Sequence, residues 1–351
     1  MKRSRYDLQR LVPILVLLGA VAAGARTHAA GSPAGLARLQ AQIERAARGA
    51  RGSVGVTVKH IESGAEIAVN GDEPYPMAST FKLPVLVELH AKAKAGRLNW
   101  DEKVDIGPLD QHLGSGELTP LYDVPGVTLS LRNVANLMML ISDNSAADIC
   151  LGKAGARDVN ARMAALGVKG IRVDRPCQEL ILDYQGQDTA KLKNLPMNEL
   201  REALPRGGGR SEEERWAADD KYAADPRDTA SPRAFVALLE KIVRGEAVDR
   251  AASDAMLALM KRCQTGRQRI RGMLPADTEF AHKTGSMGGS LSDVGVLYLP
   301  NKAGHVAIAV MTKRTRASSE QVEKAMAEIG RYVFDYFYFT TATESNSQGA
   351  R

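Results

Sequence analysis

The sequence has few cysteines: Cys150, Cys177 and Cys263 are the only three among 351 residues. Three is an odd number and no pair has the spacing of metal ligands, so the cysteines do not predict a metal site and allow at most one disulfide. Cys150 lies in an apolar helical context, where a cysteine is usually a core residue. We expect neither a metal ion nor another cofactor.

A long apolar run is also missing, except near the N-terminus. Residues 1–30 combine basic residues, an apolar stretch from Leu11 to Gly24, and small residues that offer cleavage after Ala29 or Ala30. This order predicts a secretory signal peptide, with an uncleaved anchor as the alternative. The stretch is short for a membrane span, and no nearby cysteine indicates a lipoprotein. We therefore expect a periplasmic or secreted protein without a stable membrane anchor.

The mature chain carries little net charge. The whole sequence has a net charge of +6, but residues 1–30 hold five basic residues and one acidic residue, which leaves +2. This balance gives no case for nucleic-acid binding. Hydrophobic residues make up 44% and charged residues 25%, which is ordinary for a globular protein and excludes a largely disordered chain.

The stretch from Met77 to Lys82 predicts a reactive serine at the start of a helix. A turn-rich segment precedes it, and apolar helix-forming residues follow. Ser79 in the first turn would lie near unpaired backbone N–H groups and the positive end of the helix dipole, which favour negative charge. Lys82 lies on the same helical face and could take the serine proton if it is desolvated. Alone, the pattern also fits a capping serine and a solvated lysine.

Two further motifs follow in order. Ser-Asp-Asn at 142–144 falls between two predicted helices, and Lys-Thr-Gly at 283–285 falls on a predicted strand. With Ser79 and Lys82, this set resembles that of class A β-lactamases and the related penicillin-binding proteins. The likeness covers nearly the whole mature chain.

The expected fold is an α/β sandwich. The sequence shows strand patterns near the N-terminus, at 53–58 and 65–69, and near the C-terminus, at 280–285, 294–299 and 306–312. These strands would share one antiparallel sheet beside a helical domain, as in the β-lactamase/transpeptidase fold. We expect a single hydrolase domain over 31–340, with an inserted excursion at 182–226. The polar tail at 341–351 predicts disorder.

The resemblance assigns roles to the motif residues. It implies that Ser79 becomes acylated, that Lys82 acts on its proton, and that Ser142 passes a proton to the departing ring nitrogen. The residues implied to bind the substrate are Asn144, Lys283, Thr284, Gly285 and Ser286. Backbone N–H groups of Ser79 and Ser286 would form the oxyanion hole, each lowering the barrier by about 3 kcal/mol. Arg314 or Arg316 would meet the substrate carboxylate, unless both are solvated surface charges.

The loop that carries the family's deacylating base departs from the pattern. Its two ends match at 172–175 and 227–229, so the resemblance implies that Arg175 pairs with Asp228 to close the loop. Counted from Arg175, however, the position of the catalytic glutamate holds Cys177.

Glu179 follows two residues later, and Ile181 stands where a water-holding asparagine is expected. Either Glu179 reaches the hydrolytic water as the catalytic base, or the loop supplies no base, since a general base must come within about 3 Å of its water. A third possibility is that Cys177 acts as a thiolate base or nucleophile. The alternative for Cys177 is a buried or disulfide-bonded cysteine without a catalytic role.

The predicted function is that of a monomeric serine β-lactamase that hydrolyses a small-molecule β-lactam through an acyl-Ser79 intermediate. The missing glutamate favours a rival function, that of a D-Ala-D-Ala peptidase-like penicillin-binding protein that acylates without rapid deacylation. The same serine and lysine would also fit a non-catalytic sensor of β-lactam or peptidoglycan, or an esterase.

Overall fold

The computed structural model describes residues 33–121, 126–205 and 209–348. The predicted signal peptide lies outside the described residues. The last helix, α13 (Ser319–Gln348), continues past residue 340 into the segment predicted as a polar tail. No glycine or proline occurs between 341 and 348 to end the helix. Within the described ranges, no helix combines the length and apolarity needed to cross a membrane.

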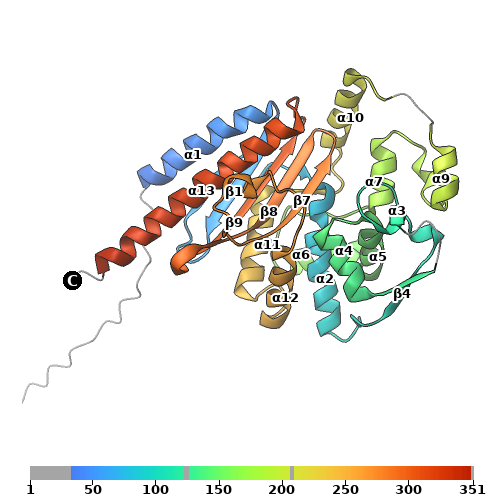
Figure 1. The fold of residues 1–351 in the computed structure, drawn as a ribbon, viewed down its shortest axis with the longest axis horizontal. Coiled ribbons are helices and arrows are strands. Elements are labelled where there is room, and N and C mark those ends of the chain that lie inside the picture. The colour runs from blue at the N-terminus through green and yellow to red at the C-terminus, as the bar shows by residue number, and fades with distance from the viewer. Residues whose placement is uncertain (1–32, 122–125, 206–208, 349–351) are drawn as a thin grey trace, which may run out of the picture.

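A five-stranded antiparallel sheet forms the centre of the molecule (Figure 1), with the strand order β2-β1-β9-β8-β7. Its strands are β1 (Ser53–His60), β2 (Glu66–Val69), β7 (Phe280–Met287), β8 (Ser290–Leu299) and β9 (Gly304–Lys313). β1 pairs with β9 from Ser53 opposite Lys313 to His60 opposite Val306. The two ends of the chain therefore share one sheet, as predicted, and β7 is an edge strand.

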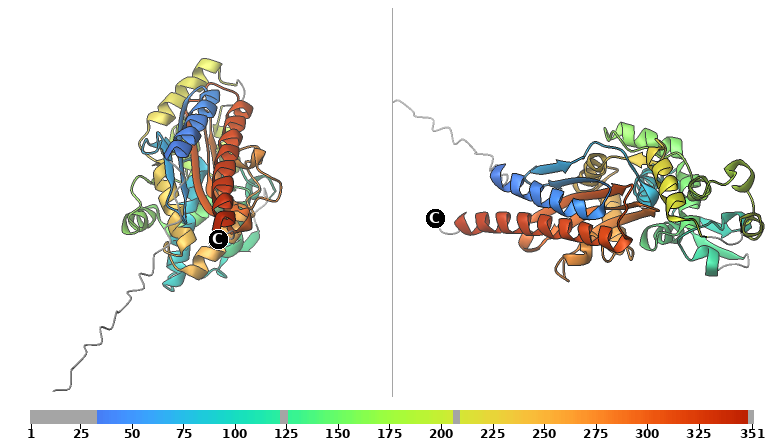
Figure 2. Two further views of the ribbon diagram at one scale, coloured as in Figure 1. Left: turned by 90° about the vertical axis from the view of Figure 1, so that its left-hand side faces the viewer. Right: turned by 90° about the horizontal axis from the view of Figure 1, so that it is seen from above.

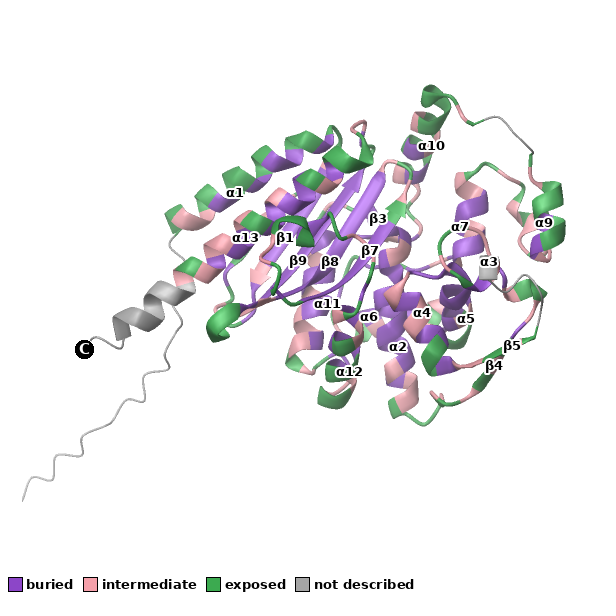
Figure 3. Ribbon diagram, viewed as in Figure 1, coloured by how far each residue is buried: buried purple, intermediate pink, exposed green. Residues whose placement is uncertain are grey.

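Helices cover both faces of this sheet. α1 (Pro33–Ala47) and α13 run side by side over one face (Figure 2), and their apolar residues, such as Ile43 and Ile329, pack on Val56 and Val310. On the other face lie α11 (Pro232–Arg244) and α12 (Arg250–Lys261), which contact β9 and β7 respectively. With both faces covered, the central strands are buried along almost their whole length (Figure 3).

A helical region lies beside the β7 edge of the sheet (Figure 1). Its helices are α2 (Lys82–Lys94), α3 (Leu118–Leu121), α4 (Leu131–Leu140), α5 (Asn144–Ala154), α6 (Ala156–Ala165), α7 (Cys177–Tyr184), α8 (Thr189–Leu192), α9 (Met197–Ala203) and α10 (Glu212–Ala224). α2 is the central helix of this region, because it is buried around most of its circumference. Such a helix is held by packing on all sides rather than by one apolar face.

Two short strand pairs complete the fold. β3 (Tyr75–Pro76) pairs with β6 (Thr229–Ala230), and β4 (Lys103–Ile106) pairs with β5 (Val127–Ser130). The second pair lies between α2 and α4 in the sequence. Its partner strand ends at Ser130, whose hydroxyl also caps α4 by accepting from Asn133 N.

Candidate active site

Ser79 lies in a 3-10 turn, η2 (Ala78–Phe81), directly before α2. The regular helix begins at Lys82, so Ser79 precedes the first α-helical turn instead of lying in it. Ala78 has a φ of +43°, a conformation that non-glycine residues rarely adopt and that is often found at functional sites. Gly285 allows β7 to lie against this turn, because a Cβ there would be 2.4 Å from Met77 O and 3.2 Å from Ser79 N.

Lys82 is fully buried and its ammonium is surrounded by oxygen atoms. Its Nζ donates to Ser142 O at 2.7 Å, to Ser142 Oγ at 3.1 Å and to Asn144 Oδ1 at 2.9 Å. Burial is the largest influence and lowers the pKa of Lys82, although the nearby Cys177 and Asp148 oppose the shift. A buried amine with a lowered pKa is suited to accept a proton.

Ser142 connects the two buried lysines of the site. Its Oγ also accepts from Lys283 Nζ at 3.0 Å, and Lys283 donates to Thr284 O at 2.8 Å. Burial lowers the pKa of Lys283 to about 7, aided by the positive charge of Lys82. Ser142 itself has a φ of +61°, a second unusual backbone conformation at this site.

Asp143 and Asn144 hold the neighbouring loop in place. Asp143 caps α5 by accepting from Ala146 N at 2.8 Å, and it also accepts from the backbone N–H groups of Glu117 and Leu118. Asn144 Nδ2 donates to Leu113 O at 2.9 Å, so the same amide bridges Lys82 and the loop. The tripeptide at 142–144 thus joins α2, α5 and the 113–118 loop.

A cleft of about 430 Å³ opens beside Ser79. Its polar lining comes from Ser79, Ser115, Ser142, Asn144, Cys177, Thr265, Arg269, Thr284 and Ser286. Within the described ranges no aspartate or glutamate lines this cleft, and its wall includes the apolar Leu180 and Ile181 of α7.

The arginine beside the strand motif is Arg269, which the motifs of the sequence did not indicate. Its Nη2 donates to Ser286 Oγ at 2.6 Å and its Nη1 donates to Gly285 O at 2.9 Å, while Glu323 pairs with its Nε. Arg269 is buried and belongs to irregular chain between α12 and β7, where no motif marks it.

Arg314 and Arg316, the expected candidates, both pair instead with Asp220 of α10. They do not line the cleft. The expectation failed because it relied on closeness to the end of β9 in sequence, whereas the inserted helix α10 supplies their partner.

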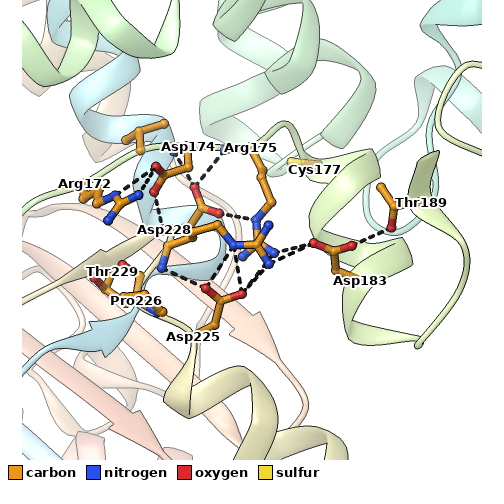
Figure 4. Close-up of polar contacts among 12 residues, drawn as sticks. Arg172, Asp174, Arg175, Cys177, Asp183, Thr189, Asp225, Pro226, Asp228 and Thr229 are labelled. Atoms are coloured by element: carbon orange, nitrogen blue, oxygen red, sulfur yellow. Dashed lines mark hydrogen bonds and ion pairs between the residues drawn. The ribbon is translucent and has the colours of Figure 1, made fainter.

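The predicted pair of Arg175 and Asp228 is confirmed (Figure 4). Arg175 Nε lies 2.7 Å from Asp228 Oδ2, and Asp228 Oδ1 accepts from the backbone N–H groups of Asp174 and Arg175. Arg175 also pairs with Asp183 and Asp225, which lie at the two ends of the excursion. One buried guanidinium therefore closes the loop.

Cys177 and Glu179 face different surroundings although they are two residues apart on α7. Cys177 lines the cleft, and burial raises the pKa of its thiol well above the usual value, with the charge of Asp148 adding to the effect. Glu179 pairs with Lys193 at 3.0 Å and lines a separate hollow with His112. Two residues along a helix rotate a side chain by about 200°, so both cannot face the same cleft.

The excursion at 182–226 also reaches the rim of the cleft. Asp219 of α10 accepts from Tyr184 Oη at 2.8 Å and from Gly289 N at 2.9 Å. Gly289 belongs to the turn between β7 and β8, next to the cleft-lining Gly288. At the start of α10, Ser211 and Glu214 form a capping box.

Comparison with known proteins gives a consistent result. A family model described as the beta-lactamase enzyme family matches residues 38–337. Beta-lactamase AST-1 of Nocardia asteroides is 29% identical over 291 residues, 80% of this chain and 78% of that protein. A beta-lactamase structure from Chitinophaga pinensis is 27% identical with a TM-score of 0.68, covering 85% of this chain and 98% of that one. An ancestral class A beta-lactamase has 25% identity and a TM-score of 0.67, covering 85% and 99%.

These matches span nearly all of the described fold, and they confirm the predicted α/β sandwich as the class A β-lactamase fold. The chain belongs to the beta-lactamase enzyme family.

Proposed function

We propose that this protein is a serine hydrolase that opens the β-lactam amide bond through an acyl ester on Ser79. The observation that carries this proposal is the position of Ser142 Oγ, 3.1 Å from Lys82 Nζ and 3.0 Å from Lys283 Nζ, in the same cleft as Ser79. Two amines on one hydroxyl form a path along which a proton can move from the nucleophile to the leaving group. The family assignment supports the same chemistry.

Acylation begins when Ser79 Oγ attacks the β-lactam carbonyl and the neutral amine of Lys82 takes its proton. Negative charge then develops on the carbonyl oxygen, where the N–H groups of Ser79 and Ser286 would stabilise it. The close packing of β7 on the Ser79 turn at Gly285 supports this pairing of donors. The carbon–nitrogen bond breaks, the ring nitrogen takes the proton of Ser142, and Lys82 returns a proton to Ser142.

Substrate binding is assigned to the two ends of the cleft. Arg269 and the hydroxyls of Thr284 and Ser286 would bind the carboxylate of the substrate, since a buried arginine beside two hydroxyls suits a carboxylate. Asn144 would hold the amide side chain of the substrate while it also holds Lys82.

Deacylation requires a water molecule and a base. Because no carboxylate lies on the described cleft wall, the remaining candidate for the base is Lys82. Lys82 would take a proton from the water molecule as the water oxygen attacks the ester carbonyl. The ester bond to Ser79 then breaks, and Ser79 regains a proton. Acylation brings its own nucleophile in Ser79, whereas the attacking water has no carboxylate on the described cleft wall to hold and orient it. We therefore expect hydrolysis of the acyl ester to be slower than its formation.

The pattern of residues 1–30 supports export to the periplasm or secretion, and we propose that the mature protein acts as a monomer without a cofactor.

The test is turnover of a chromogenic cephalosporin by the mature protein, with its intact mass recorded during the reaction. We expect a burst of product, a covalent adduct, and then slow steady turnover, all abolished by Ser79→Ala. One equivalent of product with an adduct that never clears would overturn hydrolysis and leave a peptidase-like protein or a sensor. Absence of both product and adduct would overturn the β-lactam assignment.

A further inference from the structure

A second polar cluster lies behind the strand that carries Lys283. His282 of β7 contacts Asp293 of β8 with 2.8 Å between Nδ1 and Oδ1, and its ring stacks on Phe280. Cys263, two residues beyond the end of α12, lies near enough to His282 for the imidazole to influence the ionisation of its thiol. All three side chains of this Cys263–His282–Asp293 cluster are buried. A thiol beside an imidazole that is paired with a carboxylate is an arrangement that stabilises a thiolate.

The charges around Cys263 favour its ionised form. They are the positive charges of His282 and Lys283 on β7. Asp293 on β8 is negative and pairs with His282, while Lys82 and Arg269 act on Lys283. Burial opposes ionisation of the thiol, but the interaction with His282 outweighs it and lowers the pKa of Cys263 to about 6. Burial likewise opposes the imidazolium, but the charge of Asp293 raises the pKa of His282 to about 9.

A line of hydroxyl groups joins Cys263 to the cleft. Cys263 Sγ lies 3.2 Å from Thr265 Oγ1, and Thr265 Oγ1 lies 2.6 Å from Thr284 Oγ1. His282 and Thr284 are two residues apart on β7 and so point to the same face of the strand, where the segment from Cys263 to Thr265 lies. Thr265 and Thr284 line the cleft, whereas Cys263 does not.

The direction of these hydrogen bonds depends on the proton of Cys263. A thiolate can only accept, so Thr265 donates to it and must then accept from Thr284, whose single proton is turned away from the cleft. When Cys263 is protonated, its S–H can donate to Thr265. Thr265 then donates to Thr284, and Thr284 is free to donate into the cleft.

We propose that Cys263 is a positioning residue for substrate binding: its protonation, transmitted through Thr265, decides whether the Thr284 hydroxyl donates to the substrate carboxylate. The inference rests on the proposed function only in naming that carboxylate as the group bound. Its consequence is that affinity for a carboxylated β-lactam falls as the pH rises through the titration of Cys263.

The first experiment measures the thiolate without substrate. All three cysteines are free, and burial raises the pKa of both Cys150 and Cys177, so one thiolate is expected at neutral pH. Its ultraviolet absorbance should titrate well below an ordinary thiol in the wild-type chain and in Cys150→Ala, and should disappear in Cys263→Ala. A titration unchanged by Cys263→Ala would overturn the inference whether or not the protein acts on β-lactams.

The second experiment measures the dissociation constant of a carboxylated β-lactam on the Ser79→Ala chain across the same pH range. We expect affinity to fall about tenfold through the titration of Cys263, the worth of one hydrogen bond to a charged group. Thr265→Val keeps the thiolate and the shape but cuts the line of hydroxyls, so the pH step should vanish while the thiolate absorbance remains.

Cys263→Ser, which keeps a hydroxyl that does not ionise in this range, should also abolish the step. A step that persists in Thr265→Val would show that the charge acts through space and would overturn the relay. No binding at any pH, with the thiolate present, would count against the β-lactam assignment and remove the proposed role of Cys263 in binding it.

Discussion

Glu179 Oε1 lies 3.0 Å from Lys193 Nζ, in a hollow separate from the cleft that contains Ser79. Glu179 is the carboxylate that the sequence offered as a base near the expected loop position, and this ion pair holds it away from the cleft. We predict that Glu179→Gln leaves the rate of acyl-ester hydrolysis within about twofold of the wild type, because it alters only a partly exposed ion pair. The measurement is the decay of the adduct mass after excess substrate is removed. Accumulation of a permanent adduct in this variant would restore Glu179 as the base.

Cys177→Glu should have the opposite effect. Cys177 lines the cleft near Lys82, so a carboxylate there would stand where a water molecule could approach the acyl ester. Because general-base catalysis contributes about 10²-fold or more, we predict a gain of that order in hydrolysis of the adduct. Cys177→Gln has the same size without the charge and is the matched control. Equal gains in both variants would mean that cleft shape, and not a base, limits hydrolysis.

These two residues show where sequence reasoning succeeded and where it failed. The register that placed Cys177 at the glutamate position was counted from Arg175, and the predicted Arg175–Asp228 pair is present. Glu179 faces Lys193 because of the way α7 is oriented in the fold. A shift of one residue in the start of a helix rotates its side chains by about 100°, so the sequence did not determine the direction of Glu179.

The fold was predictable from strand patterns, and the lysine–serine network was implied by the resemblance of three motifs to a known family. Strand alternation identified the sheet, and the motifs that contain Lys82, Ser142 and Lys283 meet in space as expected. Arg269 was not predictable, because it stands in irregular chain and its partners come from β7, β8 and α13. Contacts of that kind leave no local signal in one sequence.

The proposed contact between Arg269 and the substrate carboxylate can be tested by substitution. Arg269→Ala should raise KM for carboxylated β-lactams about tenfold or more while kcat changes less, since it removes a binding contact that is also present in the ground state. Arg314→Ala, which removes an exposed arginine paired with Asp220, is the control and should leave KM unchanged. Steady-state kinetics of both variants provide the measurement. An equal effect of the two substitutions would exclude Arg269 as the carboxylate ligand.

The closure of the loop can be tested through stability. Asp228 is buried and accepts from two backbone N–H groups and from Arg175, so Asp228→Ala leaves a buried guanidinium without one of its partners. We predict a loss of about 3 kcal/mol in the free energy of unfolding, measured by urea denaturation. Arg172→Ala, which breaks an exposed pair with Asp174, should cost less than about 1 kcal/mol. Similar losses in the two variants would contradict a special role for Asp228.

The pH dependence of acylation should report on Lys283. Its ammonium donates to Ser142 Oγ, and burial lowers its pKa to about 7, so this positive charge is lost as the pH rises through neutrality. If the charge helps Ser142 to deliver its proton, the acylation rate at saturating substrate falls on the alkaline side, by about tenfold per pH unit for a single ionisation.

Lys283→Arg keeps a charge at all these pH values and should remove the alkaline fall, even if the overall rate is lower. Lys261→Arg, on the outer end of α12, is the control and should leave the profile unchanged. Rapid-mixing measurements of adduct formation give the rate apart from substrate affinity, so the effect of Lys283 is separated from that of Cys263. An alkaline fall that survives in Lys283→Arg would assign the titration to another group, since a guanidinium does not lose its proton in this range.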